Sequence, residues 1–224
     1  MEYLLDTANI EEIKICCDYL PIAGVTSNPS ILKKEGKIDF FGHMRAIREI
    51  IGKQPLHIQV TAPDAQGMLL DAEAIVQHVD KKAYIKVPTN PDGLKVIGIL
   101  KKQGYNVTAT AIYSTAQGLL AMEAGADCLA PYYNRMENLN INPEEVIRSF
   151  AAMIDRYGYK TQIIAASFKN MGQVNKAFLA GAQAATVDPS ILKSALTMPD
   201  IQKAVEDFDS DWKSVYGGKY IADL

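Results

Sequence analysis

The residue that says most about possible chemistry is Lys86, which lies in the short apolar run YIKVP at residues 84–88. A run of this kind predicts a strand that is covered on both faces, where an ammonium group loses much of its hydration. Burial lowers the pKa of a lysine and supplies a neutral amine near pH 7, which can attack a ketone to form an imine. A lysine that reaches solvent from a strand end, or that pairs with an acid, would explain the same pattern.

Polar side chains also end or follow the other apolar runs. In a barrel of alternating strands and helices, reactive groups project from the carboxyl ends of the strands, so these positions are candidate site residues. They are Asp6, Thr26, Asn28, Gln59, Thr110, Tyr132, Arg135, Ser167 and Lys169. We expect them to gather around Lys86 at one end of the fold.

Three of these residues suit a phosphate group. Arg135 follows the sixth apolar run, while Ser167 and Lys169 end the seventh, just before a helix that is predicted to start near Asn170. Two cations, a hydroxyl group and the free N–H groups of a helix start could hold one phosphate. A surface Arg and Lys beside a helix-capping Ser is the alternative interpretation.

The histidines and cysteines match no metal-ligand spacing, and no glycine-rich phosphate cup accompanies a lysine. We therefore expect neither a metal nor an organic cofactor, and no disulfide framework. The histidines are expected to lie on the surface or to be core residues with satisfied hydrogen bonds, and the cysteines to be packing residues. These residues are His43, His57, His78, Cys16, Cys17 and Cys128.

Eight β-rich apolar runs alternate with helical patterns from end to end. We predict strands at 3–7, 24–28, 56–60, 84–88, 107–113, 128–133, 162–166 and 184–187. This alternation predicts an α/β fold with a single closed (β/α)8 barrel, for which 224 residues suffice because such barrels start at about 200 residues. An open doubly wound sheet is less favoured, since neither a G-x-G-x-x-G pattern nor a P-loop occurs.

Local signals mark the boundaries of the helices. Asn or Asp followed by Pro or acidic residues predicts a helix start, and a glycine just before the next strand predicts a helix end. The start signals are Asn9, Asn142 and Asp188, and the end signals are Gly104, Gly125, Gly158 and Gly181. This order of helix end and strand is typical of repeated β/α units.

No linker or change of composition divides the chain, so residues 1–224 are predicted to form one barrel domain with a C-terminal helical arm at 200–216. The apolar residues of this arm recur at helical spacing. They are Ile201, Val205, Phe208, Trp212 and Val215. Such a stripe needs burial, either as a lid on the bottom of the barrel or against a neighbouring subunit.

The charge balance excludes some classes of partner. The chain has 23 basic and 26 acidic residues, a net charge of -3, so nothing in its composition indicates binding to nucleic acid or to an anionic membrane. The N-terminus lacks the pattern of a signal peptide, and no apolar stretch approaches the ~18 residues that a membrane span needs. We expect a cytoplasmic protein.

At these residues the chain resembles the transaldolase family, in its short single-domain branch. The similar segments are LDTA at 5–8, GVTSNPS at 24–30, IKVP at 85–88, the stretch around Thr110, APY at 130–132 and AAS at 165–167. They occur in the family's order and span essentially the whole chain. The resemblance implies a metal-free, Schiff-base (β/α)8 enzyme of carbohydrate metabolism in the pentose phosphate area.

The resemblance also implies roles for the candidate residues. Lys86 becomes the imine-forming lysine. Around it the family places catalytic groups at Asp6, Gln59, Thr110 and Tyr132, and donor-binding groups at Thr26 and Asn28. Arg135, Ser167 and Lys169 fall where the family holds the phosphate of the aldehyde substrate. Asp6 as a structural acid that merely keeps Lys86 charged is the alternative role.

Three positions bear on which activity of this branch applies. Transaldolases resemble one another in having Glu, Phe and Arg where this chain has Gln59, Tyr132 and Lys169, whereas the fructose-6-phosphate aldolase subfamily has the residues found here. A tyrosine hydroxyl that faces the imine can pass a proton through a water and so release free dihydroxyacetone. We therefore expect an aldolase that interconverts fructose 6-phosphate with dihydroxyacetone and glyceraldehyde 3-phosphate.

Two other functions stay open at this point. A transaldolase would move the dihydroxyacetone unit between sugar phosphates, and a non-catalytic barrel would bind sugar phosphates as a sensor. The family likeness also implies a homo-oligomer, a decamer of two pentameric rings whose C-terminal helices are exchanged between neighbours. Two departures affect the donor pocket: Ser27 stands where Thr is commoner, and Tyr133 adds an aromatic residue beside Tyr132.

Overall fold

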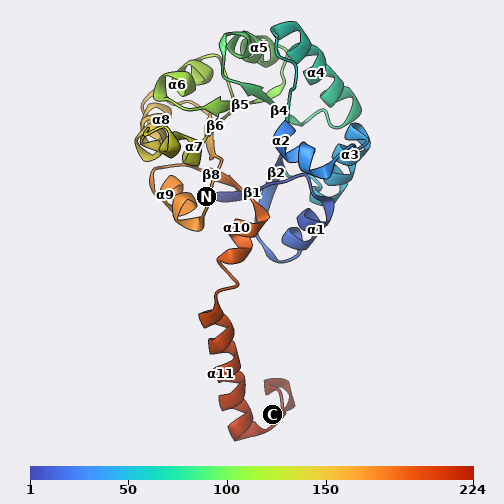
Figure 1. Ribbon diagram of the computed structural model, residues 1–224, viewed down its shortest axis with the longest axis vertical. Coiled ribbons are helices and arrows are strands. Elements are labelled where there is room, and N and C mark those ends of the chain that lie inside the picture. The colour runs from blue at the N-terminus through green and yellow to red at the C-terminus, as the bar shows by residue number, and fades with distance from the viewer. The chain divides into compact units, whose positions relative to one another are not determined.

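The computed structural model describes residues 1–224. Eight parallel strands close into a barrel in which neighbours pair in chain order and β1 pairs with β8. Figure 1 looks into this barrel, with the strands in the middle and helices around them. The strands are β1 Glu2–Asp6, β2 Ile22–Thr26, β3 Leu56–Gln59, β4 Tyr84–Pro88, β5 Asn106–Ile112, β6 Cys128–Pro131, β7 Gln162–Ala165 and β8 Ala184–Val187. The predicted (β/α)8 barrel is confirmed.

The helices that connect the strands cover the outside of the barrel because the outward side chains are apolar; Ile85 and Val87 of β4, for example, are fully buried. The helices are α1 Ile10–Tyr19, α2 Pro29–Leu32, η1 Lys33–Glu35, α3 Phe40–Ile51, α4 Ala65–His78, α5 Pro91–Lys102, α6 Thr115–Glu123, α7 Tyr133–Asn138, α8 Pro143–Tyr157, α9 Met171–Leu179, α10 Pro189–Ser194, α11 Pro199–Tyr216 and η2 Ile221–Asp223.

The predicted strand ends need two corrections that matter for the site. β2 ends at Thr26 rather than at residue 28, because Asn28 is the N-cap of α2 and its Oδ1 accepts the Ile31 backbone N–H at 3.0 Å. β6 ends at Pro131 rather than at residue 133, because Tyr132 precedes α7 and Tyr133 begins it. In both cases a polar or aromatic residue that looks like the end of a strand starts a helix instead.

The predicted helix boundaries are confirmed. Asn9 caps α1, with its Oδ1 accepting the Glu12 N–H at 2.9 Å, and Asn142 caps α8 in the same way. Gly104, Gly125, Gly158 and Gly181 have φ values of 82°, 97°, 68° and 108°. These left-handed conformations strain residues that carry a Cβ, which explains why glycine ends these helices.

The interior of the barrel changes from apolar to polar along its axis. Near the amino ends of the strands, Leu4, Cys128, Ile164 and Ala184 form a buried cluster against which Tyr84 packs. Toward the carboxyl ends the inward residues are polar, and Thr26, Lys86, Thr108, Thr110 and Thr186 are all buried. The apolar layer closes one end of the barrel and leaves the polar groups to the other.

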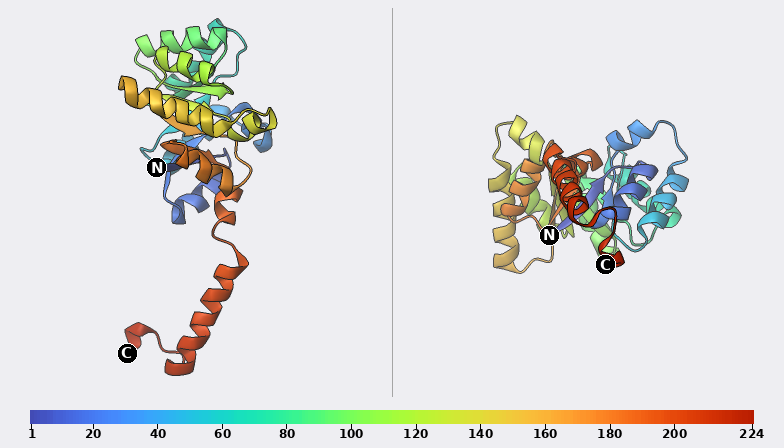
Figure 2. Two further views of the ribbon diagram at one scale, coloured as in Figure 1. Left: turned by 90° about the vertical axis from the view of Figure 1, so that its left-hand side faces the viewer. Right: turned by 90° about the horizontal axis from the view of Figure 1, so that it is seen from below.

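The chain forms two compact units, Met1–Pro189 and Ser190–Leu224. The second unit contains most of α10 together with α11 and η2, and Figure 2 shows α11 as one uninterrupted helix. Its Trp212 ring lies 4.4 Å from that of Tyr216, and the indole N–H donates to the Lys219 carbonyl at 2.7 Å. None of the helices, α11 included, combines the length and apolar character that a membrane-spanning segment requires.

Two glycines of α5 provide a matched test of how tightly this helix packs beneath the site. A Cβ at Gly93 would overlap the carbonyl oxygen of Pro88 at the end of β4, whereas a Cβ at Gly98 would have no atom within 4 Å. We expect Gly93→Ala to lower the free energy of unfolding by about 1–3 kcal/mol, as overpacking does. Gly98→Ala should raise it by up to about 1 kcal/mol, because alanine favours a helix.

Urea denaturation of both variants checks this prediction. An equal effect of the two substitutions would contradict the close approach of α5 to the end of β4.

Candidate active site

Lys86 is held inside the barrel, on β4. Its side chain is 3% exposed, and Nζ donates a hydrogen bond of 3.0 Å to the carbonyl oxygen of Ser27. The flanking residues Ile85 and Val87 point outward to the helices, so strand alternation turns Lys86 inward. The alternative that Lys86 reaches solvent from the strand end is therefore wrong.

Burial is the largest influence on the pKa values of Lys86 and Asp6, and it favours the neutral form of both groups. It lowers the pKa of Lys86, an effect that the nearby Asp6 carboxylate partly offsets. It raises the pKa of Asp6, which Lys86 and a hydrogen bond from Thr26 partly offset. Since a low-dielectric interior disfavours every charged form, the site favours a neutral amine on Lys86.

A directed chain of hydroxyl groups orients Asp6. Thr26 Oγ1 donates to Asp6 Oδ1 at 2.7 Å, and Thr26 Oγ1 also lies 2.7 Å from Thr186 Oγ1. Because the Thr26 hydroxyl has one proton and gives it to Asp6, Thr186 must be the donor to Thr26. Thr186 was not predicted as a site residue, although a hydroxyl at an inward position of β8 is the signal that could have found it.

A second polar pair joins Thr110 of β5 to Tyr132, which follows β6. Thr110 Oγ1 donates to the Tyr132 hydroxyl at 3.0 Å, and both residues are buried. Burial raises the pKa of Tyr132, so its phenol keeps its proton at neutral pH. The next residue, Ala111, has a φ of 57° where the register of β5 shifts against β6, an irregularity that sets the direction of Thr110.

Gln59 and Asn28 lie at neighbouring strand ends. Gln59 pairs in register with Lys86, and its Oε1 atom is buried without a hydrogen-bond partner. Asn28 uses Oδ1 to cap α2, which leaves its amide NH2 group to donate to a ligand. Both side chains therefore have hydrogen-bonding capacity to spare beside Lys86.

The three predicted phosphate ligands lie at the carboxyl end of β6 and β7, but no contact joins their side chains to one another. The Arg135 guanidinium lies over the Tyr132 ring, 4.5 Å from its centroid, and donates to the Tyr113 hydroxyl at 3.2 Å. Ser167 has a φ of 65°, a strained conformation for a residue with a Cβ, and Lys169 is exposed. Tyr113 is a further residue that was not predicted.

The histidines and cysteines are dispersed. No group of three or more His, Cys, Asp or Glu side chains is placed to hold a metal ion. None of the three cysteines forms a disulfide, and Cys16 and Cys128 are buried as predicted for packing residues. His57 differs from its prediction, because its Nε2 atom is buried and has no hydrogen-bond partner.

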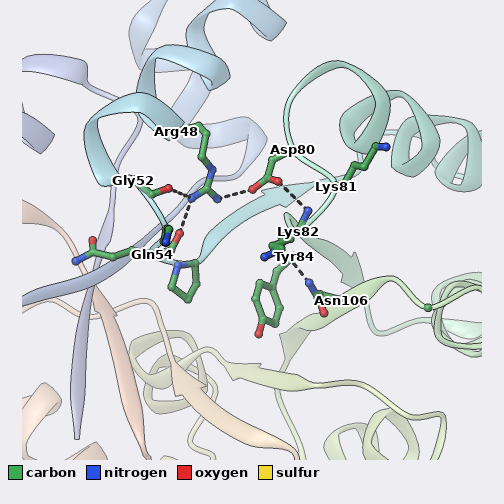
Figure 3. Close-up of a pocket in the computed structure, with 11 residues that line it drawn as sticks. Arg48, Gly52, Gln54, Asp80, Lys81, Lys82, Tyr84 and Asn106 are labelled. Atoms are coloured by element: carbon green, nitrogen blue, oxygen red, sulfur yellow. Dashed lines mark hydrogen bonds and ion pairs between the residues drawn. The ribbon is translucent and has the colours of Figure 1, made fainter.

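A pocket of about 690 Å3 lies at the opposite end of the barrel, among the loops that precede β3, β4 and β5 (Figure 3). There the Arg48 guanidinium pairs with Asp80 at 3.0 Å and donates to the carbonyl oxygens of Gly52 and Gln54 at 2.8 and 2.7 Å. The Tyr84 ring points away from this ion pair. These contacts tie the loops together, and the pocket contains none of the predicted site residues.

The structure thus defines a (β/α)8 barrel whose site is built on one buried lysine at the carboxyl ends of the strands. The sequence agrees with this class, and the chain belongs to the family described as Transaldolase/Fructose-6-phosphate aldolase, which it matches over residues 3–218. The resemblance predicted from the short motifs is confirmed.

Three relatives illustrate the two activities in this family. A probable fructose-6-phosphate aldolase of Streptococcus pneumoniae is 53% identical over 222 residues, 99% of this chain and 100% of the relative. A probable transaldolase of Agathobacter rectalis is 34% identical over 97% of this chain and 100% of its own length. A probable transaldolase of Lactiplantibacillus plantarum is 34% identical over 96% of this chain and 97% of its own length.

The opposing influences on Lys86 give a testable expectation for the free protein. In Asp6→Asn the pKa of Lys86 should fall further, because Asp6 is the group that offsets the effect of burial. The pKa is measured by 15N NMR of the lysine Nζ across a pH titration. Asp64→Asn, which keeps the cap of α4 and removes a carboxylate that is not among the groups shifting the pKa of Lys86, is the control. A raised or unchanged pKa of Lys86 in Asp6→Asn would contradict the pairing.

Proposed function

We propose that this chain is a fructose-6-phosphate aldolase that works through an imine on Lys86. The observation that carries the proposal is the burial of the Lys86 amine beside Asp6, since burial supplies a neutral nucleophile and Asp6 supplies an acid–base group. The 53% identity to a probable fructose-6-phosphate aldolase supports the same activity.

In the first half of the reaction, the neutral amine of Lys86 attacks the C2 carbonyl of open-chain fructose 6-phosphate, and loss of water gives a protonated imine. The C3–C4 bond then breaks, and its electron pair moves toward the imine nitrogen to leave an enamine. Asp6 accepts the proton of the C4 hydroxyl in this step, so that C4 becomes the aldehyde of glyceraldehyde 3-phosphate.

In the second half, a proton must reach C3 of the enamine and a water must hydrolyse the imine. The Tyr132 phenol is protonated at neutral pH and hydrogen-bonded to Thr110, and Gln59 has an unpartnered amide oxygen. We assign to Tyr132 the proton transfer, through a water that Thr110 and Gln59 hold. Dihydroxyacetone then leaves and Lys86 is regenerated.

The remaining predicted residues bind the substrate or position Asp6 in this proposal. Asn28 donates its free NH2 group to hydroxyl groups of the donor, and Thr26 holds Asp6 in place. The phosphate of the aldehyde product binds to Arg135, Ser167 and Lys169. Two cations and a hydroxyl group can each donate a hydrogen bond to a phosphate oxygen, and the bonds from the cations are charge-assisted.

Transaldolase activity is the second candidate, and the two 34% identical relatives favour it. The two activities differ in the fate of the enamine, which an aldolase protonates and a transaldolase passes to an acceptor aldehyde. The buried phenol of Tyr132 favours protonation, and a phenylalanine in its place has no proton to give. A non-catalytic sugar phosphate sensor has no use for a lysine with a lowered pKa.

Trapping of the imine tests the role of Lys86. Borohydride with dihydroxyacetone should leave one reduced three-carbon unit on the tryptic peptide that contains Lys86, detected by mass spectrometry. Lys86→Met should form no adduct, while the exposed Lys82→Met, just before the same strand, should trap normally. An unmodified Lys86 peptide in the wild-type protein would reject the imine mechanism and leave the sensor as the better candidate.

Release of glyceraldehyde 3-phosphate from fructose 6-phosphate without any acceptor separates the two enzyme activities, and Tyr132→Phe sharpens the test. We expect this variant to lose about 10²–10⁴-fold in acceptor-free cleavage, the usual contribution of a general acid, and much less in transfer to an added aldehyde. Tyr133→Phe is the control, because the Tyr133 hydroxyl faces Glu144 instead of the site. Equal losses of cleavage and transfer in Tyr132→Phe would argue against its assigned role.

A further inference from the structure

His57 is a buried polar residue that the proposed reaction does not use. It lies on β3, is 1% exposed, and has its Nδ1 atom 2.8 Å from Thr108 Oγ1. Its Nε2 atom is also buried and has no partner. A polar ring at this depth costs free energy that a phenylalanine or leucine would not, so its presence calls for an explanation beyond packing.

The bond between His57 and Thr108 crosses the inner face of β4. His57 belongs to β3 and Thr108 to β5, and β4 lies between these strands. The inward residues of β4 are Tyr84 and Lys86: the Tyr84 ring stacks on the imidazole with centroids 4.5 Å apart, and the charge of Lys86 acts on His57. The bond therefore passes between Tyr84, toward the apolar layer, and Lys86, toward the site.

The neighbours of this bond indicate the tautomer of His57. A neutral imidazole has one N–H group, which lies here either on Nδ1, beside Thr108, or on Nε2, which is buried without a partner. An N–H group on Nε2 would be a buried donor without an acceptor, so we place the proton on Nδ1, where it donates to the Thr108 oxygen. The unpartnered Nε2 is in that case a lone pair, which is easier to leave without a bond than an N–H group.

The imidazole is uncharged at neutral pH. Burial lowers the pKa of His57 to about 3, with smaller contributions in the same sense from the cations Lys86 and Arg48. Cys128, Tyr84 and Asp6 are other titratable groups near this layer, and burial raises the pKa of all three. The Cys128 thiol and the Tyr84 phenol are therefore also uncharged at neutral pH. His57 therefore acts as a fixed dipole and not as an acid or base.

The main chain of His57 reaches Lys86 by a second path. The His57 carbonyl oxygen accepts the Ser27 backbone N–H at 3.0 Å and the Ser27 hydroxyl at 3.4 Å. The Ser27 carbonyl in turn accepts the hydrogen bond from Lys86 Nζ at 3.0 Å. A shift of His57 therefore moves both the imidazole that lies beneath Lys86 and the Ser27 carbonyl oxygen that orients the Lys86 amine.

We propose that His57, held by Thr108, is a positioning residue that places the amine of Lys86 for imine formation and adds an uncharged polar surface beneath it. A carboxylate in this position would keep Lys86 protonated, and an apolar side chain could not be fixed in place by a hydrogen bond to Thr108. A neutral imidazole bound on one side and stacked on the other avoids both effects. The reaction part of this inference rests on the proposed function.

Two substitutions separate position from packing. His57→Phe keeps a ring that can stack on Tyr84 but has neither nitrogen, and Thr108→Val keeps the shape of Thr108 but has no hydroxyl. Each should lower kcat for cleavage of fructose 6-phosphate about 10- to 100-fold with little change in KM, the usual effect of a small misplacement of a reacting group. The double variant should be no worse than the singles, because the same bond is lost once.

His57→Asn is the rescue variant, since its amide N–H can donate to Thr108 as Nδ1–H does, and it should recover most of the lost kcat. The free enzymes give a second readout that needs no turnover. In His57→Phe the pKa of Lys86, followed by 15N NMR of Nζ, should fall below its wild-type value, because an apolar ring in place of the polar imidazole further disfavours the ammonium form. Thermal unfolding and circular dichroism identify any variant that is simply misfolded.

Two results would overturn the inference. One is a folded His57→Phe enzyme with wild-type kcat and an unchanged pKa of Lys86. The other needs no variant: 15N NMR of the wild-type imidazole should find the proton on Nδ1 and no titration down to about pH 4, and a proton on Nε2 would contradict the assignment. A wild-type enzyme that forms no borohydride adduct would instead reject the proposed function, and the NMR results would still judge the placement of Lys86.

Discussion

The removal of an amine and a carboxyl group from water is the constraint on which the rest of this site depends. Lys86 and Asp6 are each pushed toward the neutral form by burial, and each partly restores the charge of the other. Such a pair is costly unless further hydrogen bonds satisfy the remaining protons and lone pairs. The threonine hydroxyls, the Ser27 carbonyl and the imidazole of His57 are the groups that provide or border these bonds.

Each of these bonds joins strands that are distant in sequence. Thr186 of β8 reaches Thr26 of β2, which reaches Asp6 of β1, and His57 of β3 reaches Thr108 of β5. The polar network therefore exists only when the barrel is closed. The apolar layer of Leu4, Cys128, Ile164 and Ala184 supplies packing at the other end. The residues that stabilise the barrel interior and the polar residues of the candidate site therefore lie in different layers of the barrel.

The sequence predicts the barrel well because its signals are local and repeated. Eight apolar runs, the caps at Asn9 and Asn142, and the glycines that end helices each report a backbone preference that tertiary structure does not override. The motif around Lys86 likewise locates the buried amine, since alternation along β4 turns it inward.

Other parts of the site lie beyond such reasoning because they depend on contacts between strands. The ends of β2 and β6 were misplaced because Asn28 and Tyr132 are the residues that precede helices α2 and α7. Thr186 and the unpartnered Nε2 of His57 were missed because the sequence of a strand does not show whether a hydroxyl or an imidazole faces polar groups or the apolar core. The position of Arg135 over the Tyr132 ring follows from the fold of α7, which no short pattern encodes.

The hydroxyl chain that ends at Asp6 has a stereochemical consequence. Thr26 donates to Oδ1 of the carboxyl group, so in the proposed reaction Oδ2 is the atom left to meet a substrate hydroxyl. One fixed oxygen on one side of the nucleophilic carbon admits an aldehyde in a single orientation of its carbonyl group. In the synthetic direction, the configuration of the new alcohol centre would then depend on which of the two carboxylate oxygen atoms of Asp6 is hydrogen-bonded to Thr26.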